Sequence, residues 1–515
     1  LSRAVREVFV QLYDKGLIYR GNYIINWCPR CHTALSNEEA EHQEVEGRLW
    51  HIRYPLADEP GRWVTVATTR PETMLGDTAV AVHPADEKNA DLVGREVELP
   101  LTGRRIPIVT DEFVDPEFGS GFVKVTPAHD PNDFEIGRRH GLTELNVMHG
   151  DATMNDNAPP AYRGLDRFEA RNRIIADLEA AELLEKVEKH AHAVGHCYRC
   201  DTVVETRLSL QWFVRMQPLS EPAQAAFRAG DLRFHPERFG ATYEHGMTNV
   251  RDWCIRRQLW WGHRIPVWYC QDPACEQIAV SRDELQSCPA CGGAVEQDPD
   301  VLDTWFSSWL WPFSTLGWPE ETEDVRTFYP THTLSTAPEI LFFWVARMVM
   351  AGLEFRGALP FTDVLLHGTV RDAQGRRMSK SLGNGIDPLR VVEMFGADAM
   401  RYTLVSAAAL GTDLQLDHED LESSFRVGRN FANKIWNVAR FALGYLTSDD
   451  VARDPRDLEL EIADRWILSR LTDATGAVTD SLTKFRLHEA AEAAYHFVWS
   501  EFADWYVELV KQRLR

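Results

Sequence analysis

The sequence has 515 residues, of which 44% are hydrophobic and 26% are charged, and its formal net charge is −23. This composition is typical of a folded globular protein, and the length exceeds what one hydrophobic core can hold, so about three or four domains are expected. The acidic balance excludes broad electrostatic attraction to nucleic acid, and any RNA site must therefore be local.

Targeting and cysteine patterns narrow the class further. The longest apolar run, residues 340–350, contains Arg347 and is too short for a membrane span. Nine cysteines without a secretory signal favour metal binding over disulfides, and we expect a reducing cytoplasm. Because Leu1 is not an initiator methionine, we expect the sequence to begin inside a longer protein.

The first elements lead into a cysteine pair. Hydrophobic residues recur at helical spacing over residues 5–12, and Gly16 suits a C-terminal cap, so an amphipathic helix is predicted. A strand at residues 23–25 follows and runs into Cys28 and Cys31. Cys197 and Cys200 repeat the same spacing much later. Two such pairs favour one tetrahedral zinc site at the base of an inserted domain, with redox-active or idle thiols as alternatives.

The segment between these pairs has a different character. Strand-like runs at residues 63–67 and 79–82 alternate with turns, and residues 167–184 read as a helix, which predicts a mostly β domain. Polar clusters occur at residues 68–73 and 124–133. Taken singly, each cluster is more typical of a polar turn than of a site.

A strand at residues 211–214 marks the return to the first domain, and a segment rich in Trp and Arg follows at residues 252–263. Core packing explains most of its tryptophans. Cys254 is interpreted as a buried free thiol. A second set of cysteines has spacings within the range of zinc knuckles; its members are Cys270, Cys275, Cys288 and Cys291.

Residues 338–352 read as a helix, with Ser335 or Thr336 as its N-cap and Gly352 as its stop. Residues 361–366 then have the content of a buried parallel strand that ends at His367 and Gly368. Ligands of open α/β sheets bind beyond the carboxyl ends of such strands, so a ligand site is expected there.

The loop at residues 376–384 combines cations, hydroxyls and glycine, which is the chemistry of a mobile phosphate-binding loop. On its own it is more typical of a solvated turn than of a phosphate site. A helix is predicted from Asp387 and Pro388 to Gly396. Further helices are predicted at residues 464–471 and 488–514, after one whose apolar face comprises Phe431, Ile435, Val438, Ala442 and Tyr445.

Two phrases carry a resemblance to a known family. Residues 367–372 together with residues 377–388 are similar to the signature of class I aminoacyl-tRNA synthetases, in the version of the valyl-tRNA synthetase family. Arg377 stands where the family has Lys, which keeps the charge but not the shape. Leu382 and Gly385 stand where the family usually has Lys and Val, and Glu339 replaces a shorter acid.

The resemblance implies an α/β fold: a Rossmann-type class I synthetase catalytic domain with an inserted mostly-β editing domain, zinc-binding insertions and a C-terminal α-helical anticodon-binding domain. The expected ranges are 1–42 and 188–417 for the catalytic domain, with a zinc-bearing insertion at about 264–298, 43–187 for the editing domain, and 418–515 for a helical domain that is cut short.

The resemblance also implies residue roles. Lys380, Ser379 and Ser381 are implied as catalytic. ATP is assigned to His367, Gly368, Met378 and Lys380, and the amino-acid pocket to Trp305, Trp344 and Glu339. Arg256, Arg257 and His263 are placed on the active-site side without a role. The implied editing residues are Arg70, Thr73, Lys124, Thr126, Asp130 and Asp133, with Asp133 binding either the substrate amino group or a hydrolytic water.

The implied reaction is ATP-dependent attachment of valine to tRNA(Val), with ATP, Mg²⁺ and Zn²⁺ as cofactors, by a monomer in the cytoplasm. Editing is needed because a hydrophobic pocket cannot strongly reject threonine, a near-isostere of valine; these two amino acids are the standard illustration of that limit. No His-x-Gly-His motif occurs in the sequence, and we expect it upstream of Leu1. The alternatives are a tRNA-deacylating module without synthetic activity, or isoleucine as the substrate.

Overall fold

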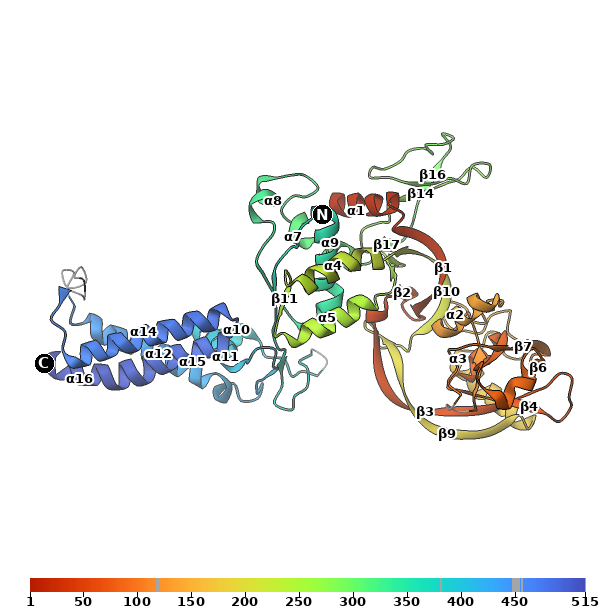
Figure 1. Cartoon of the computed structure of the whole chain (residues 1–515), viewed down its shortest axis with the longest axis horizontal. Coiled ribbons are helices and arrows are strands. Elements are labelled where there is room, and N and C mark those ends of the chain that lie inside the picture. Colours follow the sequence, from red (N-terminus) through yellow and green to blue (C-terminus); the bar gives the residue numbers. More distant parts are fainter. Residues whose placement is uncertain (117–119, 380–381, 447–453, 455–456, 515) are drawn as a thin grey trace. The chain divides into compact units, whose positions relative to one another are not determined.

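The computed structural model describes residues 1–116, 120–379, 382–446, 454 and 457–514. The chain forms two compact units. The first comprises Leu1–Leu219 and Val250–Glu321, and the second comprises Ser220–Asn249 and Thr322–Arg515. Each unit therefore contains segments that lie far apart in the sequence (Figure 1).

The first unit is built on an antiparallel sheet in the order β12-β10-β1-β2. Its strands are β1 (Ile18–Cys28), β2 (Thr33–Leu35), β10 (Glu205–Val214) and β12 (Trp253–Cys254). Helix α1 (Ser2–Asp14) buries the predicted apolar face, and Phe9 meets Trp212 and Phe306 edge to face. The predicted strands at 23–25 and 211–214 are confirmed, and both are longer because they pair along most of their length.

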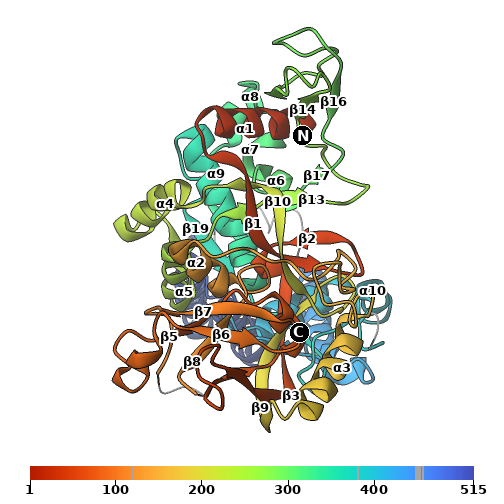
Figure 2. The same ribbon diagram turned by 90° about the vertical axis from the view of Figure 1, so that its right-hand side faces the viewer.

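Two long antiparallel strands, β3 (Ala40–Pro55) and β9 (Leu184–Cys197), lead from this sheet into the insertion. Figures 1 and 2 show them side by side. Strand β4 (Trp63–Thr68) pairs with β3, and a second sheet has the order β6-β7-β5-β8. The remaining strands are β5 (Ala79–Val82), β6 (Glu96–Leu99), β7 (Arg104–Thr110) and β8 (Phe122–Val125).

The predicted strands at 63–67 and 79–82 are therefore confirmed. Short 3₁₀ segments and two helices connect the strands of this region. These elements are η1 (Asn37–Glu39), η2 (Pro71–Gly76), η3 (Glu87–Leu92), α2 (Pro131–His140) and α3 (Arg167–Ala180). The prediction of a helix to residue 184 is wrong at its C-terminal end. Glu182 adopts a positive φ, the Leu183 N–H bonds back to the Leu178 carbonyl, and Leu184 begins β9.

The rest of the first unit consists of short elements. A small sheet in the order β15-β14-β16 carries the second cysteine set. The elements are β13 (Arg256–Arg257), β14 (Val267–Cys270), β15 (Ile278–Val280), β16 (Val295–Gln297), β17 (Val301–Leu302), α6 (Trp305–Ser308) and α7 (Trp311–Ser314). Cys254 is buried and free, as predicted.

The second unit contains a parallel sheet in the order β11-β19-β18, and the buried strand predicted at 361–366 is confirmed as its centre. Its strands are β11 (Arg233–His235), β18 (Thr333–Thr336) and β19 (Asp363–Leu366). Other elements are α4 (Gln217–Ala229), which begins in the first unit, α5 (Arg238–Thr248), α8 (Glu323–Phe328), β20 (Val370–Arg371) and β21 (Leu414–Gln415).

The helix predicted at 338–352 differs from the observed one. The segment is a 3₁₀ turn η4 (Pro338–Ile340), a π-helical turn η5 (Leu341–Val345) and α9 (Ala346–Arg356). Ala337 is the N-cap of the first turn and makes no side-chain cap bond, so neither Ser335 nor Thr336 caps it. Gly357 ends the helix in a left-handed conformation. Gly352 instead permits close packing, because a Cβ there would lie 2.7 Å from Tyr329 Oη.

The C-terminal part is helical, as predicted. Its helices are α10 (Pro388–Phe395), α11 (Ala397–Ala407), α12 (Leu421–Leu443), α14 (Ile462–Thr483), α15 (Leu487–His496), the π-helix η7 (Phe497–Tyr506) and α16 (Val507–Leu514). Asp387 caps α10 and Gly396 ends it, as predicted.

The predicted face of α12 is only partly correct. Phe431 is buried, but Ile435 is 43% exposed and Tyr445 lies beyond the helix. Ile435, Val438 and Ala442 line an apolar groove whose other walls come from α14, η7 and α16. The buried half of α12 is its N-terminal half, because that half packs against α11.

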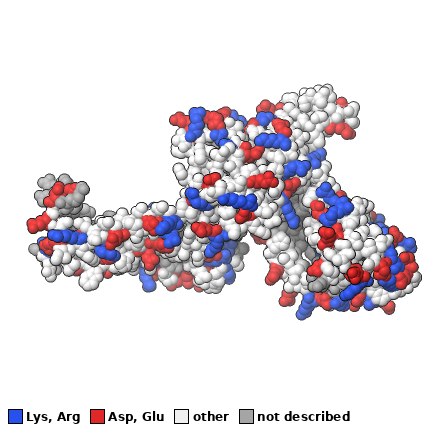
Figure 3. Space-filling model, viewed as in Figure 1, with Lys and Arg blue, Asp and Glu red and all other residues white. Residues whose placement is uncertain are grey.

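None of the described helices combines the length and the apolar character needed to cross a membrane. On the face shown in Figure 3, Lys and Arg side chains are interspersed with Asp and Glu side chains among the described residues. That mixture agrees with the expectation that any RNA site is local.

Candidate functional site

The base of the loop at 376–384 is organised by two residues that lie within the motif phrases but received no role from them, Asp372 and Asn384. Asp372 is fully buried and accepts hydrogen bonds from the backbone N–H and Nε of Arg376, both at 2.8 Å. Asn384 Nδ2 donates to Asp372 Oδ2 at 2.9 Å, and Asn384 Oδ1 accepts from the Ser379 N–H at 2.9 Å. These bonds join the two ends of the loop. Lys380 and Ser381 lie outside the described residues.

The charge of Asp372 is stabilised where it lies. The hydrogen bond from Asn384, followed by the bonds from Arg376, lowers the pKa of Asp372 to about 2. Met378 packs against the core that holds Val391 and Phe395. The signal available in the sequence was an Asp and an Asn on either side of a basic stretch, since short polar residues often stabilise turns.

The end of β19 lies near the same loop in sequence and shows a close backbone approach. A Cβ at Gly368 would lie 1.9 Å from the Thr412 carbonyl oxygen, so only glycine fits. His367 is exposed, and its Nδ1 lies 3.0 Å from the Gly368 carbonyl oxygen. The Thr369 hydroxyl donates to Glu339 Oε1 at 2.8 Å, which brings Glu339 to this strand end. The structure thus gathers His367, Gly368 and Glu339.

The two tryptophans predicted to line the amino-acid pocket belong to different units. Trp344 lies half-buried in the π-helical turn η5, a geometry that is frequent at functional sites. Trp305 is half-buried at the start of α6, where its backbone N–H donates to Asp303 Oδ1 at 3.1 Å. Their meeting in one pocket stays a prediction.

The arginines near Trp305 are committed to carboxylates. Arg257 is almost fully buried, and its Nη2 donates to Glu39 at 2.7 Å and to Asp303 at 2.9 Å. Arg256 Nε donates to Asp300 at 2.6 Å. These ion pairs hold β13 and the start of α6 in place, so both arginines stabilise the fold here.

A second cluster lies in the inserted β region. Thr126 Oγ1 donates to Asp77 Oδ1 at 2.5 Å, and Lys124 Nζ lies 3.4 Å from the same oxygen and bonds Thr126 Oγ1. The Thr126 backbone N–H donates to Asp133 Oδ2 at 2.8 Å. The structure therefore joins Lys124, Thr126 and Asp133, and it adds Asp77, which the sequence analysis missed.

The two aspartates of α2 behave differently. Asp130 is the N-cap of α2 and accepts from the backbone N–H groups of Asn132 and Asp133, at 2.8 and 3.2 Å. Asp133 is buried, and burial raises its pKa to about 7 although Lys124 opposes the change. Asp133 is therefore a carboxyl group poised between its two protonation states near neutral pH.

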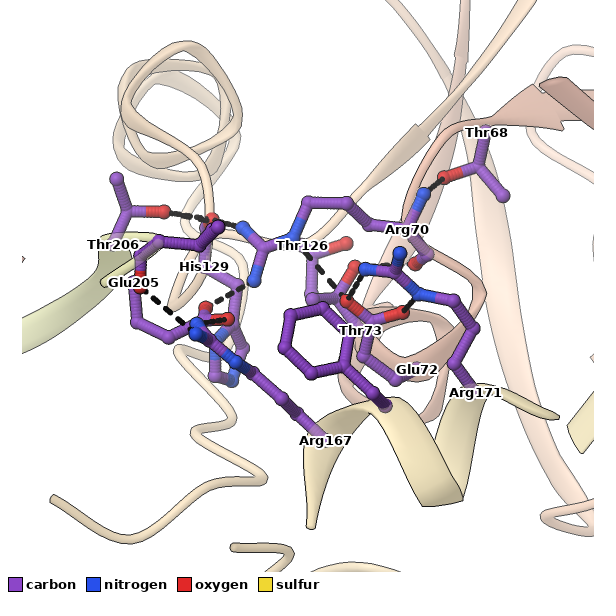
Figure 4. Close-up of polar contacts among 12 residues, drawn as sticks. Thr68, Arg70, Glu72, Thr73, Thr126, His129, Arg167, Arg171, Glu205 and Thr206 are labelled. Atoms are coloured by element: carbon purple, nitrogen blue, oxygen red, sulfur yellow. Dashed lines mark hydrogen bonds and ion pairs between the residues drawn. The ribbon is translucent and has the colours of Figure 1, made fainter. Parts of the chain in front are cut away.

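Arg70 and Thr73 lie in an adjoining network, shown in Figure 4. The Arg70 guanidinium bonds Glu205 of β10, and its Nη1 donates to the His129 carbonyl at 3.2 Å. Arg167 Nη1 donates to the other oxygen of Glu205 at 2.6 Å. Thr73 Oγ1 donates to the Arg70 carbonyl at 3.0 Å, so it shapes the backbone at this position.

The partner of Arg70 on the other side is Glu72, which is fully buried and accepts from Arg171 through two bonds of 2.7 Å. The network therefore alternates three arginines with two glutamates. Because Glu205 belongs to β10 of the base sheet, the network ties the inserted region to that sheet.

The cysteines form the two groups that their spacing predicted. Within each group the sulfur atoms all lie within 4.8 Å of one another. The groups are Cys28, Cys31, Cys197 and Cys200, and Cys270, Cys275, Cys288 and Cys291. In the first group, Cys28 ends β1 and Cys197 ends β9, the last strand of the insertion. The group therefore lies where the insertion joins the base sheet. Four thiolates in a compact group suit zinc or an iron–sulfur cluster.

Comparison with known proteins assigns the family. Residues 1–417 match the family described as tRNA synthetases class I (I, L, M and V), and residues 464–515 match the anticodon-binding domain of tRNA ligase. The chain therefore belongs to the class I tRNA synthetases, and the expected pairing of a catalytic domain with a C-terminal helical anticodon-binding domain is confirmed.

Within that family, the similar curated proteins are valine–tRNA ligases. The chain is 57% identical to those of Carboxydothermus hydrogenoformans and Geobacter sulfurreducens and 54% identical to that of Thermotoga maritima. Each alignment covers 100% of this chain and 57–58% of the relative. The chain thus spans little more than half the length of these relatives.

Two solved structures share the fold at low identity. One is the ternary complex of Agrobacterium radiobacter K84 agnB2 LeuRS with tRNA and LeuAMS, with a TM-score of 0.53 at 21% identity, covering 100% of this chain and 70% of that one. The other is Mycobacterium tuberculosis methionyl-tRNA synthetase bound by methionyl-adenylate, with a TM-score of 0.53 at 15% identity, covering 100% and 66%.

Proposed function

We propose that the protein to which this chain belongs attaches valine to tRNA(Val) through valyl-adenylate at the expense of ATP. The observation that carries this proposal is the 57% identity to valine–tRNA ligases over the whole chain. In the first step the valine carboxylate attacks the α-phosphorus of ATP and pyrophosphate leaves. In the second step the 2′-hydroxyl of the terminal adenosine of the tRNA takes the valyl group and AMP leaves.

The residues assigned to the first step come from the second unit, except Trp305, which belongs to the first. Lys380 neutralises charge that develops on the phosphates, with Ser379 and Ser381 as further donors. His367, Gly368 and Met378 border the nucleotide, while Trp305, Trp344 and Glu339 contact the amino acid. Support comes from the position of His367 and Gly368 at the carboxyl end of β19, where α/β sheets bind ligands. Magnesium, when bound, shields the leaving pyrophosphate.

The inserted region, residues 43–187, hydrolyses threonyl-tRNA(Val) in a second pocket formed by Arg70, Thr73, Lys124, Thr126, Asp130 and Asp133. A polar pocket can hydrogen-bond the threonine hydroxyl, whereas valine would leave its polar groups unpaired. The gathering of Lys124, Thr126 and Asp133 within hydrogen-bond distance supports this proposal. Asp133 binds the substrate amino group or orients the water.

Each cysteine group holds one structural zinc ion. The fit is chemical: each group offers four sulfur ligands, which is the donor set of closed tetrahedral zinc sites. Zinc, when bound, contributes folding free energy and takes no part in the reaction. Since the structure has all nine cysteines outside disulfide bonds, a reducing compartment such as the cytoplasm suits the protein. We also infer that the protein is a monomer.

A second candidate concerns the chain by itself. No His-x-Gly-His motif occurs in its sequence, whereas the Lys124 cluster is present in the described residues. The chain alone therefore acts as a deacylating module that makes no adenylate.

The test is charging of tRNA(Val) by the full-length protein with valine, isoleucine or threonine. Valine charging supports the proposal, and preferential isoleucine charging overturns the substrate assignment. Pyrophosphate exchange by the chain alone would contradict the second candidate.

A further inference from the structure

One carboxylate that no sequence motif singled out lies at the centre of the Lys124 cluster. Asp77 follows η2 and is fully buried. Its Oδ1 accepts from Thr126 Oγ1 at 2.5 Å and lies 3.4 Å from Lys124 Nζ. Its Oδ2 accepts from the Tyr54 hydroxyl at 2.7 Å. Two side chains of the proposed editing pocket are thus bound to a single buried oxygen.

The backbone that carries Asp77 is itself fixed. Arg104 donates to the carbonyl oxygens of Leu75 and Asp77, at 2.6 and 3.0 Å. Gly76 packs so closely that a Cβ there would lie 2.8 Å from the Leu145 carbonyl oxygen. The carboxylate therefore has little freedom to move. A rigid buried anion holds a neighbouring ammonium group in one orientation, because an unpaired charge of either sign would be costly there.

We propose that Asp77 is a positioning residue for editing, which fixes the Lys124 ammonium and the Thr126 hydroxyl where they meet the aminoacyl end of threonyl-tRNA. This inference rests on the proposed function of the inserted region. Because Asp77 is fully buried beneath these side chains, it acts through them and not on the substrate.

The same geometry couples Asp77 to Asp133. Thr126 bonds Asp77 through its hydroxyl and Asp133 through its backbone N–H. The charged groups that face Asp133 are Lys124 on β8, Asp130 at the start of α2, and Asp77 after η2. The charge of Asp77 raises the pKa of Asp133, and Lys124 lowers it. Removal of the Asp77 charge therefore makes Asp133 easier to ionise.

The experiment measures hydrolysis of threonyl-tRNA(Val) by the chain across pH, with Asp77→Asn as the test variant. We expect kcat to fall roughly a hundredfold, since small misplacements of a pocket group have effects of that size. KM should stay near that of the parent, and the midpoint of the acid limb should move to lower pH. Asp111→Asn is the matched control, because Asp111 is a buried carboxylate of the same region that bonds Arg139 and His140 instead. It should keep the parental rate and midpoint.

A parental rate in Asp77→Asn overturns the inference. A slower variant whose midpoint does not move also overturns it, because a merely structural defect lowers the rate without changing the ionisation of Asp133. If Asp77→Asn fails to fold, Tyr54→Phe decides, since it frees only Oδ2; a several-fold lower kcat supports the inference and an unchanged kcat contradicts it. A parent chain that leaves threonyl-tRNA intact overturns the proposed function, and this inference with it.

Discussion

At the scale of single residues, the buried charges of the inserted region have distinct environments. Asp77 is paired with Lys124, Thr126 and Tyr54, whereas Asp133 receives one backbone bond and faces Lys124. Burial without a full set of partners is what raises the pKa of Asp133 to about 7. Its protonation state therefore changes near neutral pH.

The first prediction concerns the pH dependence that Asp133 causes. Both proposed roles need the ionised carboxylate, so hydrolysis of threonyl-tRNA(Val) should rise as the pH passes upward through about 7. Asp133→Asn, which can still accept the Thr126 N–H, should abolish that rise and most of the activity. A pH series of deacylation rates measures both effects. Undiminished hydrolysis by the variant would remove Asp133 from the mechanism.

As part of the same prediction, the free energy of unfolding should change in the opposite sense and fall as the pH rises. The pKa of Asp133 is raised from 3.8 to about 7 by folding, so the folded state binds the proton more tightly than the unfolded state. Its favourable contribution is complete below pH 3.8 and is lost as the pH rises to about 7. Urea unfolding at several pH values should show this loss in the parent and not in Asp133→Asn.

Lys380 provides the second prediction at this scale. If its charge stabilises the phosphates chiefly in the transition state, Lys380→Ala in the full-length protein should lower the adenylation rate constant far more than the affinity for ATP. Pre-steady-state adenylation and ATP binding separate the two quantities. An equal loss in both would argue against a transition-state role.

At the scale of elements, the base of the loop at 376–384 is held by hydrogen bonds of an uncharged residue, Asn384, and not by its basic residues alone. Asn384 bonds Asp372, the Arg377 carbonyl and the Ser379 N–H, and so connects three points of the loop. Arg371, which ends β20 and directly precedes Asp372, also bonds Asp413 next to β21. These polar contacts therefore fix the base of the 376–384 loop.

The third prediction tests these hydrogen bonds. Asn384→Ala in the full-length protein should slow adenylation by about tenfold to a hundredfold, because the loop loses its fixed orientation. Gln374→Ala is the matched control just before the loop, since the Gln374 side chain accepts one bond of 3.3 Å from the exposed end of Arg376. Pyrophosphate exchange measures both variants. Similar rates for the two would show that Asn384 does not position the loop.

At the scale of the whole molecule, a group of four cysteines and a set of ion pairs join distant segments of the first unit. Cys28 and Cys31 meet Cys197 and Cys200 across the long insertion, and Glu205 bonds Arg70 and Arg167 across the same junction. Both features connect the base sheet to the inserted region. Their loss should therefore affect the unit as a whole and not one loop.

The fourth prediction is the metal content. The purified chain should contain about two zinc ions, one for each group of four cysteines. Cys197→Ser should lose one ion and lower the midpoint of thermal unfolding, because the site closes the base of the insertion. Cys254→Ala removes a buried thiol that belongs to neither group, so it should keep both ions. Metal analysis that finds iron or no metal in the parent would contradict the assignment.

The sequence by itself determined the family, the order of the main elements and the two cysteine groups. These features depend on local information: hydrophobic periodicity, cap residues such as Asp387 and Gly396, and motif spacing. Short-range signals failed where tertiary contacts decide, as at Gly352, which permits packing against Tyr329 and does not end a helix. Ile435 likewise shows the right periodicity but lines a groove.

Only the tertiary structure decided which residues surround the motif residues. Asp77, Glu205 and Asp372 lie outside the residues that the motifs assigned to a site, yet they hold Lys124, Arg70 and the base of the 376–384 loop. The physical reason is that a buried charge must find a partner in space, and that partner can come from any strand that passes nearby. A sequence motif therefore identifies a charged residue that needs a partner, whereas only the folded structure shows which residue that partner is.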